Sequence, residues 1–207
     1  ESIKEDGLVI LDTTNKNIVS WLNARKDTLK SKNIIELKNP KNISYIENLG
    51  WIEFDYDNKK IKSKLLAAHS ANQIITAYEV AKYLKMDKSI IIDSIEKISY
   101  TPHRLELIYN PNSNLYVVDD SYNGNVEWVK STVKLLKNIT NHRKLYLSPG
   151  LVELGIESDK IHFEIWEMLS WVIDKALLIE NSQTKMIEKW LLESGFSKNN
   201  IIFYKTT

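Results

Sequence analysis

The last hundred residues alternate between short apolar runs and longer stretches with helical periodicity, and this alternation constrains the fold more than any other feature. Apolar runs of strand length recur at five places: residues 105–109, 116–119, 144–147, 176–179 and 201–203. Stretches with apolar residues at helical spacing separate the later runs: residues 126–137, 158–173 and 183–194. Strands that alternate with helices are typical of right-handed βαβ units and a mainly parallel sheet. The sequence therefore predicts an α/β fold for this region.

The first hundred residues show a different pattern. A helix at 15–30 is predicted between strands at 8–11 and 34–37, and short strands between 43 and 63 include a hairpin that turns at Asp57 and Asn58. Two helices follow, one at 70–85 and one that Asp87 can cap. Pro102 then disfavours helix in the residue before it. We expect two domains, residues 1–101 and 102–207.

Composition and charge exclude several classes of protein. The 28 basic residues nearly balance the 27 acidic ones, which gives no general electrostatic case for binding nucleic acid or an anionic membrane. The chain has no cysteine, which excludes disulfide scaffolds, thiolate metal sites and cysteine nucleophiles. No apolar run is long enough to span a bilayer, and no signal-peptide pattern is seen. A cytoplasmic location is therefore expected.

The most chemically specific segment is Asp119-Asp120-Ser121-Tyr122-Asn123-Gly124-Asn125, between a predicted strand and a predicted helix. Proteins of the α/β class build binding sites at the carboxyl ends of their strands. Two adjacent carboxylates there are costly to bury unless they are solvated or paired, and they suit a ribose hydroxyl or a cationic substrate group. The alternative is a structural loop, in which Asn125 caps the helix and Glu127 lies in its first turn.

A second polar segment opens the helix predicted at 70–85. His69, Ser70, Asn72 and Gln73 lie where free backbone N–H groups favour polar ligands. Amide side chains offer a donor and an acceptor together, which matches the edge of a purine. The alternative is helix capping, with His69 as a structural histidine.

Two further segments lie at strand ends. Arg104 follows Pro102 at the entry to a strand, and its guanidinium suits phosphate; a surface ion pair is the alternative. Gly150 and Gly155 bracket a loop that follows a strand and leads to His162 on the next helix. Each of these motifs is weak alone.

Phosphate-binding glycine loops are missing from the sequence. Its six glycines form neither G-x-x-x-x-G-K-[ST] nor G-x-G-x-x-G. A self-sufficient nucleotide site is therefore not expected.

Taken in order, the four segments resemble the Mur ligase family. That family carries a G-x-H-N-x-x-N helix start, a P-x-R, a D-D-S-Y-N-A-N-P loop and a G-x-M-x-E-L-G loop with a downstream histidine. The counterparts here are residues 67–73, 102–104, 119–126 and 150–155 with His162. The Ser-Tyr-Asn-x-Asn loop is similar to that of the branch that adds D-alanyl-D-alanine, because sister ligases carry other residues after the aspartate. The resemblance covers nearly the whole chain.

The resemblance implies a fold and a set of site residues. The chain would be the later part of the central ATPase domain, followed by most of a Rossmann-like C-terminal domain with a mainly parallel sheet. It begins at Glu1 and ends in a strand-like run, so we expect a fragment of a longer protein. The residues implied to lie near the nucleotide are His69, Asn72, Gln73, Arg104 and Asp120. Those implied to face the amino substrate are Asp119, Tyr122, Asn123, Asn125, Leu151 and Glu153.

The resemblance also implies an activity for the intact protein. It would be a monomeric ATP-dependent ligase of peptidoglycan precursor synthesis that joins a D-alanyl-D-alanine-like dipeptide to a UDP-sugar peptide through an acyl phosphate. ATP and Mg²⁺ would be required, with the phosphate loop and the magnesium ligands upstream of this chain, which carries no assigned catalytic or metal residue. Two alternatives stay open: a ligase for a glutamate-type substrate, and a non-catalytic binding or scaffold protein. The fragment alone is expected to be inactive.

Overall fold

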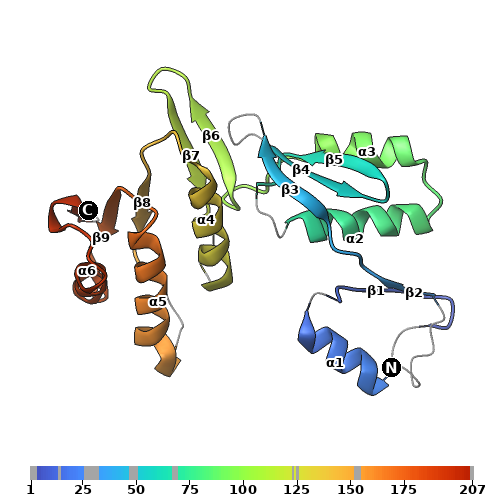
Figure 1. Ribbon diagram of the computed structural model, residues 1–207, viewed down its shortest axis with the longest axis horizontal. Helices are drawn as coiled ribbons and strands as arrows, with labels where there is room; N and C mark the ends of the chain where they lie inside the picture. Colours follow the sequence, from blue (N-terminus) through green and yellow to red (C-terminus); the bar gives the residue numbers. More distant parts are fainter. Residues whose placement is uncertain are drawn as a thin grey trace. The chain divides into compact units, whose positions relative to one another are not determined.

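The computed structural model describes residues 4–13, 15–25, 33–46, 51–66, 70–122, 124, 126–151 and 155–205. The chain divides into two compact units, Glu1–Tyr100 and Thr101–Thr207 (Figure 1). The division lies beside Pro102, the residue that interrupts the helical pattern in the sequence. Each unit has its own hydrophobic core.

The first unit begins with a βαβ arrangement. Strands β1 (Leu8–Leu11) and β2 (Asn33–Glu36) pair in parallel, and helix α1 (Lys16–Arg25) lies between them in the sequence. Leu22 of α1 packs on Val9 and Leu11 in a small core. This parallel pair requires the crossover that α1 provides, because two parallel strands cannot be joined by a tight turn.

The rest of the first unit is an antiparallel sheet with two helices. Strands β3 (Lys41–Ile46), β4 (Trp51–Tyr56) and β5 (Lys59–Ser63) form the sheet, and α2 (Ser70–Tyr83) and α3 (Lys88–Lys97) pack on one of its faces. Asp57 and Asn58 have φ of 47° and 57°, as a two-residue hairpin turn requires. Asp87 caps α3 by accepting the Ser89 N–H at 2.8 Å.

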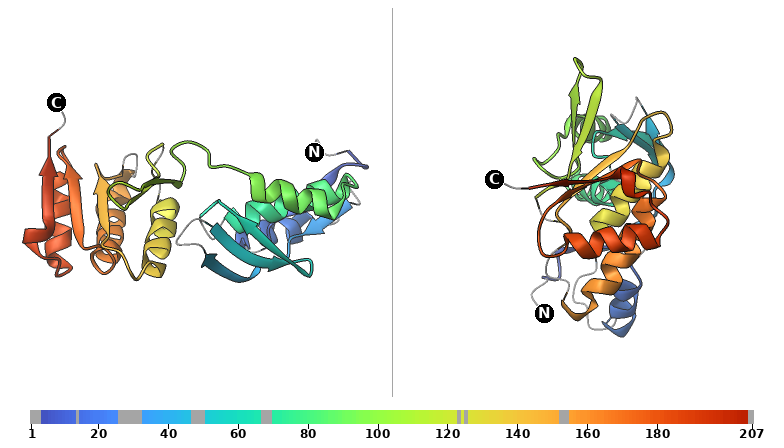
Figure 2. Two further views of the ribbon diagram at one scale, coloured as in Figure 1. Left: turned by 90° about the horizontal axis from the view of Figure 1, so that it is seen from above. Right: turned by 90° about the vertical axis from the view of Figure 1, so that its left-hand side faces the viewer.

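The second unit combines a hairpin with a parallel sheet. Strands β6 (Glu106–Asn110) and β7 (Leu115–Asp119) are antiparallel, whereas β8 (Leu145–Ser148), β9 (Lys175–Ile179) and β10 (Ile201–Tyr204) form a parallel sheet with β9 at its centre. The other elements are α4 (Val126–Asn138), η2 (Gly155–Glu157), α5 (Ser158–Ser170), α6 (Thr184–Glu193) and η3 (Lys198–Asn200). Figure 2 shows α5 between α4 and α6.

The helices of the second unit bury one face of the parallel sheet. Ala176 and Leu178 of β9 are buried against Leu169 of α5 and Leu191 of α6. Burial alternates along β9, as the period of two in a strand requires. The carboxyl end of β8 leads directly into the glycine loop that the sequence singles out.

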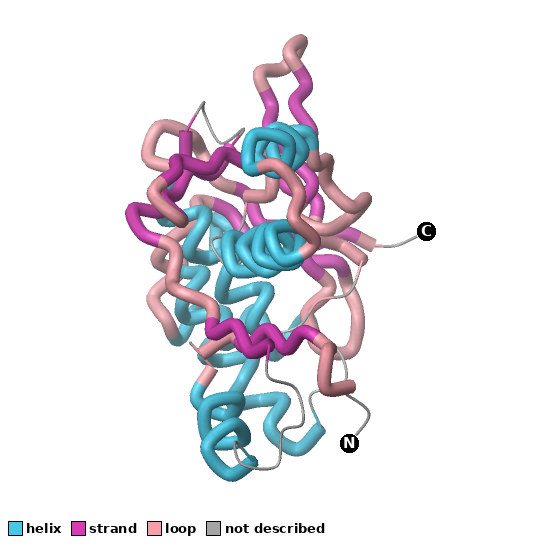
Figure 3. Tube along the Cα trace, turned by 90° about the vertical axis from the view of Figure 1, so that its right-hand side faces the viewer, coloured by secondary structure: helices cyan, strands magenta, loops and turns pink. Residues whose placement is uncertain are grey.

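The predicted fold class is confirmed: the chain contains both helices and strands (Figure 3), and β8, β9 and β10 form a parallel sheet. One detail of the prediction needs correction, because β6 and β7 form an antiparallel hairpin apart from the parallel sheet. Only residues 111–114 connect them, and a parallel pair would need a dozen or more residues. No helix in the part of the chain that the structure describes has the length and hydropathy of a membrane span.

Candidate functional site

Asp119, the last residue of β7, is held by hydrogen bonds on both of its carboxylate oxygens. Oδ2 lies 2.8 Å from His103 Nδ1, and Oδ1 accepts the Ser121 N–H at 3.0 Å. The His103 ring and Ser121 lower the pKa of Asp119, and the Asp119 carboxylate raises the pKa of His103. The two groups therefore form an ion pair when the histidine is protonated.

The backbone of His103 links two segments of the second unit. Its N–H donates to Glu106 Oε2 at 3.1 Å, and its carbonyl accepts the Tyr122 N–H at 3.2 Å. The φ of His103 is 60°, a value uncommon for a residue other than glycine. Ligand atoms of His103, Glu106 and Asp119 lie within 4.8 Å of one another, the one such group among the described residues. The hydrogen bonds of His103 with Glu106 and with Asp119 already account for this arrangement.

Asp120 has a different environment from its neighbour. It is partly buried, and its Oδ1 accepts the Leu105 N–H at 3.3 Å. Burial raises the pKa of Asp120, against the opposing effects of the Leu105 N–H and the Arg104 charge. Two adjacent carboxyl groups are thus shifted in opposite directions, a pattern that often marks groups with separate roles.

The Arg104 guanidinium lies close to two aromatic rings. Its guanidinium carbon lies 4.4 Å from the centre of the Tyr122 ring and 4.9 Å from the centre of the Trp128 ring. Both distances are within the range of cation–π attraction. Trp128 lies in the first turn of α4 and was not among the site residues predicted from the sequence.

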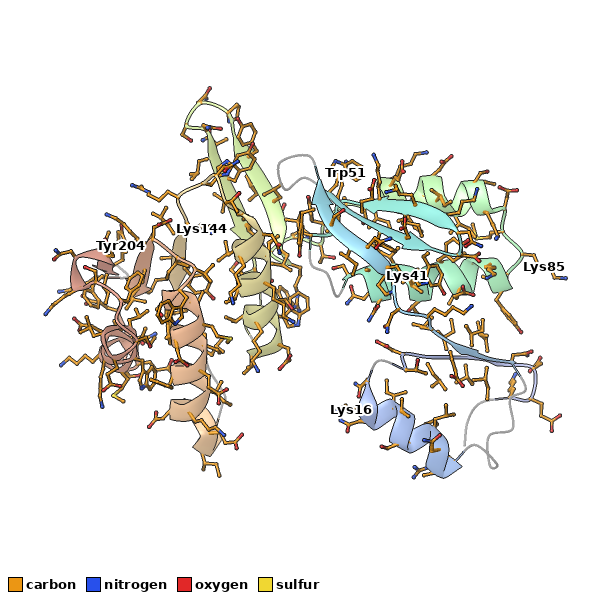
Figure 4. The ribbon with its side chains drawn as sticks, viewed as in Figure 1. Lys16, Lys41, Trp51, Lys85, Lys144 and Tyr204 are labelled. Carbon is orange, nitrogen blue, oxygen red and sulfur yellow. The ribbon has the colours of Figure 1, made fainter. Side chains whose placement is uncertain are left out.

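Residues 148–151 form a turn that three hydrogen bonds stabilise. The Gly150 N–H donates to Ser148 Oγ at 3.0 Å, Asn181 Nδ2 donates to the Pro149 carbonyl at 2.6 Å, and the Leu151 N–H donates to His162 Nε2 at 3.0 Å. Gly150 has φ of 92°, where an L side chain is strained. The turn lies at the opposite end of β8 from Lys144, which is labelled in Figure 4.

Leu151 is placed differently from what a substrate-facing side chain would require. Its side chain is 7% exposed and belongs to the core of the second unit. A Cβ at Gly124 would lie 2.9 Å from Leu151 Cδ2, so the segment after β7 and the turn after β8 are in close contact. Any contact of Leu151 with a ligand is left to its backbone.

In the first unit, Asn72 and Gln73 lie in the first turn of α2, as predicted for a helix start. Asn72 Nδ2 donates to Asp12 Oδ2 at 3.3 Å, and Gln73 is exposed. Asp12 directly follows β1 and was missed by the sequence analysis, although an acid after a buried strand is a usable signal. This amide and carboxylate pair offers both donor and acceptor atoms at one strand end.

The structure brings one group of the predicted residues together and leaves others undescribed. Arg104, Asp119, Asp120 and Tyr122 lie around the carboxyl end of β7, and Leu151 joins them through its contact with Gly124. The predicted residues outside the described part of the chain are His69, Asn123, Asn125 and Glu153. Glu106, Trp128 and Gly124 are additional members of the site.

Comparison with known proteins identifies relatives. No family model matches the chain. The chain is 24% identical over 140 residues to the UDP-N-acetylmuramoylalanine–D-glutamate ligase of Prochlorococcus marinus (strain MIT 9515), covering 68% of this chain and 27% of the relative. It is 36% identical over 121 residues to the ligase of the same name from Wolbachia sp. subsp. Brugia malayi (strain TRS), covering 58% of this chain and 22% of the relative.

The fold matches solved ligases over almost its whole length. The UDP-N-acetylmuramoylalanyl-D-glutamyl-2,6-diaminopimelate–D-alanyl-D-alanyl ligase from Acinetobacter baumannii superposes with a TM-score of 0.75 at 15% identity, covering 97% of this chain and 43% of that one. The chain spans about a quarter of the length of the curated relatives and less than half of this solved structure. The curated relatives and this solved structure are Mur ligases, and the resemblance seen in the motifs is confirmed.

Proposed function

We propose that this chain is the nucleoside-binding and amine-accepting part of a Mur ligase, an ATP-dependent amide ligase of peptidoglycan precursor synthesis. The intact protein joins a D-alanyl-D-alanine-like dipeptide to a UDP-sugar peptide. Residues 1–101 correspond to the later part of the central ATPase domain, and residues 102–207 to the Rossmann-like C-terminal domain. ATP, the UDP-sugar peptide and the dipeptide are its small-molecule partners, in a cytoplasmic monomer.

One observation carries the proposal: Arg104 and the half-buried Asp120 lie at the end of β7, in contact through Gly124 with the glycine turn that follows β8. A carboxylate at a strand end suits a ribose hydroxyl, and a guanidinium held against aromatic rings suits a phosphate. Asp120 and Arg104 are assigned to the nucleotide, and the resemblance to the family assigns His69, Asn72 and Gln73 to it as well.

The second group of residues is assigned to the amine. Asp119 carries a lowered pKa and stays ionised at neutral pH, so it can attract an ammonium group. Tyr122 is 69% exposed beside it. Asn123, Asn125 and Glu153 complete this group, and Leu151 contributes through its backbone.

The reaction follows from these assignments. A carboxylate oxygen of the UDP-sugar peptide takes the γ-phosphoryl group of ATP, and ADP leaves. The amine then attacks the acyl carbon, the C–N bond forms, and inorganic phosphate leaves as the amine loses a proton. Charge neutralisation and positioning supply most of the rate in such steps. Arg104 would contribute positive charge, and Asp119 and the 148–151 turn would orient the amine.

The ATP phosphates and Mg²⁺ are assigned to residues outside this chain. The described residues contain no glycine loop that could enclose a triphosphate. Mg²⁺, when bound, neutralises the phosphate charge. We expect no phosphate release when ATP, Mg²⁺ and substrates are added to the 207-residue chain alone.

A glutamate-type amine is the second candidate, favoured by one observation: the curated relatives are named as D-glutamate ligases. The Ser-Tyr-Asn-x-Asn sequence at 121–125 favours the dipeptide instead.

A panel of amines with the protein at its full natural length separates the candidates. Phosphate release is measured with a UDP-sugar peptide, ATP and Mg²⁺ while the amine is D-alanyl-D-alanine, D-glutamate or L-alanine. We expect kcat/KM to be highest for D-alanyl-D-alanine. A higher kcat/KM for D-glutamate overturns the dipeptide assignment, and no release with any amine favours a non-catalytic scaffold.

A further inference from the structure

His162 is a buried histidine whose two ring nitrogens both hold backbone groups. It lies in α5 and is 1% exposed. Nε2 accepts the Leu151 N–H at 3.0 Å, and Nδ1 lies 2.9 Å from the Ser158 carbonyl oxygen. A carbonyl can only accept, so Nδ1 carries the proton and Nε2 is the free acceptor. These partners select one neutral tautomer.

Packing prevents this ring from turning away. The ring stacks on Trp190 of α6 with a centre-to-centre distance of 5.4 Å and an angle of 10° between planes. Trp190 is itself 6% exposed. Rotation of the His162 ring would leave a buried N–H without a partner, and such a loss is unfavourable. The Leu151 N–H is thereby held in one direction.

A second contact holds the same turn from the other side. Leu151 Cδ2 would lie 2.9 Å from a Cβ at Gly124, closer than carbon atoms normally approach. The Leu151 side chain is packed in the core and can move only by disturbing it. Gly124 therefore permits a close approach that a residue with a side chain would prevent.

We propose that His162 is a positioning residue for the 148–151 turn, and that the Gly124–Leu151 contact sets the distance between this turn and the segment after β7. The inference rests on the proposed function, in which these two loops receive the amine. His162 touches no substrate in this scheme. It acts on amine binding by fixing the backbone of Leu151.

The hydrogen bond from the Leu151 N–H to His162 can be tested in the 207-residue chain without any substrate. In His162→Phe, a flat ring remains to stack on Trp190 while the acceptor for the Leu151 N–H is lost. We expect hydrogen exchange of the Leu151 amide to accelerate about tenfold or more, while the amides of β9 keep their protection. His142→Phe is the matched control, because His142 is exposed. NMR of the wild-type ring should show a protonated Nδ1 and an unprotonated Nε2.

The proposed effect of His162 on amine binding is tested in the protein at its full natural length. A misplaced turn should raise KM for the amine in His162→Phe by about tenfold, because displacements of about 1 Å can weaken catalysis strongly. KM for ATP should stay within about twofold, since the phosphate-binding groups are elsewhere. His162→Gln restores a side-chain acceptor and should recover part of the loss. A general loss of folded protein would instead lower kcat with all KM values unchanged.

Gly124→Ala provides a test that does not disturb the core residue His162. The added methyl should raise KM for the amine on the order of tenfold, as overpacking does. Leu151→Val shortens the opposing side chain. In the double variant Gly124→Ala/Leu151→Val, the rise in KM for the amine should therefore be smaller than in Gly124→Ala alone.

The outcomes separate the two proposals. Unchanged amine KM in both His162→Phe and Gly124→Ala, or a protected Leu151 amide in His162→Phe, overturns the positioning role. If the intact protein has no ligase activity but the Leu151 amide loses its protection as expected, the proposed function fails and the His162 contact stands.

Discussion

Two histidines hold the two loops of the candidate site, and they do so by opposite means. His103 is exposed and holds the segment after β7 through an ion pair with Asp119 and a backbone hydrogen bond to Tyr122. His162 is buried, uncharged and stacked on Trp190, and it holds the turn after β8. The first contact depends on charge, and the second depends on packing.

The difference indicates what can alter each loop. An exposed ion pair weakens with salt and with changes of pH, because water and ions screen it. A buried neutral contact responds instead to changes in volume and shape. Salt and pH can therefore change the contacts that hold the segment with Asp119 and Asp120. The position of the turn at Gly150 and Leu151 depends instead on packing in the core.

The largest expected effect is on stability, from His162→Ala. This variant leaves a cavity beside Trp190 and a buried Leu151 N–H without an acceptor. We expect a loss of about 2–4 kcal/mol in the free energy of unfolding, measured by urea denaturation and followed through tryptophan fluorescence. His103→Ala should change that free energy little. Equal losses of unfolding free energy in His162→Ala and His103→Ala would contradict the view that the buried histidine contributes more to stability than the exposed one.

Gly150→Ala should have the next largest effect on the free energy of unfolding. A Cβ at this position would lie 2.5 Å from Gln183 Oε1, and φ is 92°. We expect a loss of about 2–3 kcal/mol from strain and overpacking together, by the same denaturation measurement. Gly155→Ala is the control, because its φ is also positive but nothing lies within 4 Å of the added Cβ. It should lose about 1 kcal/mol, from backbone strain alone.

Trp128→Ala should affect nucleotide use more than stability. Removing one ring of the Arg104 stack frees the guanidinium, and KM for ATP should rise about three- to tenfold, in line with cation–π energies. Trp128→Phe should give an intermediate value, because phenylalanine offers a weaker face. Trp171→Ala, at a residue 78% exposed, serves as control. Identical KM values for ATP in all three variants would argue against the role of the stack.

The smallest effect concerns pH. The pKa of His103 is raised and that of Asp119 is lowered in the folded chain, from ordinary values of 6.5 and 3.8. Stability from the raised histidine is full below pH 6.5 and is lost as the pH rises through its folded pKa. Stability from the lowered aspartate is present above pH 3.8 and is lost as the pH falls through its folded pKa. The ion pair is thus strongest between these limits.

An NMR titration of His103 checks this interpretation. Asp119→Asn should bring the pKa of His103 down toward its ordinary value, and added salt should lower it in the wild type. A His103 pKa that stays the same in Asp119→Asn would show that the ion pair is not the cause.

Much of the fold could be predicted from the sequence, because periodicity and caps are local properties. The strand before Asp119, the helix after Asn125 and the cap at Asp87 all follow from spacing and residue type. The antiparallel pairing of β6 and β7 was not predicted. It depends on the short connection at 111–114, which cannot carry a parallel crossover.

Less of the candidate site could be predicted. Arg104 and Asp120 stood out by type and position, and both lie together at the end of β7. The stacking of Trp128 on Arg104 and the hydrogen bond from Leu151 to His162 depend on how α4 and α5 pack, over separations that no local pattern reveals. The Leu151 side chain also illustrates this limit, because an apolar residue in a glycine loop can face either a ligand or the core.

The central claim, that the segment after β7 belongs to the nucleotide and amine sites of a ligase, is tested most directly by a pair of isosteric variants in the protein at its full natural length. Asp120→Asn removes the half-buried charge and should raise KM for ATP about tenfold, as loss of a charge-assisted hydrogen bond does, with KM for the amine unchanged. Asp119→Asn should raise KM for the amine and leave KM for ATP unchanged. Unchanged KM for ATP in Asp120→Asn would contradict the account.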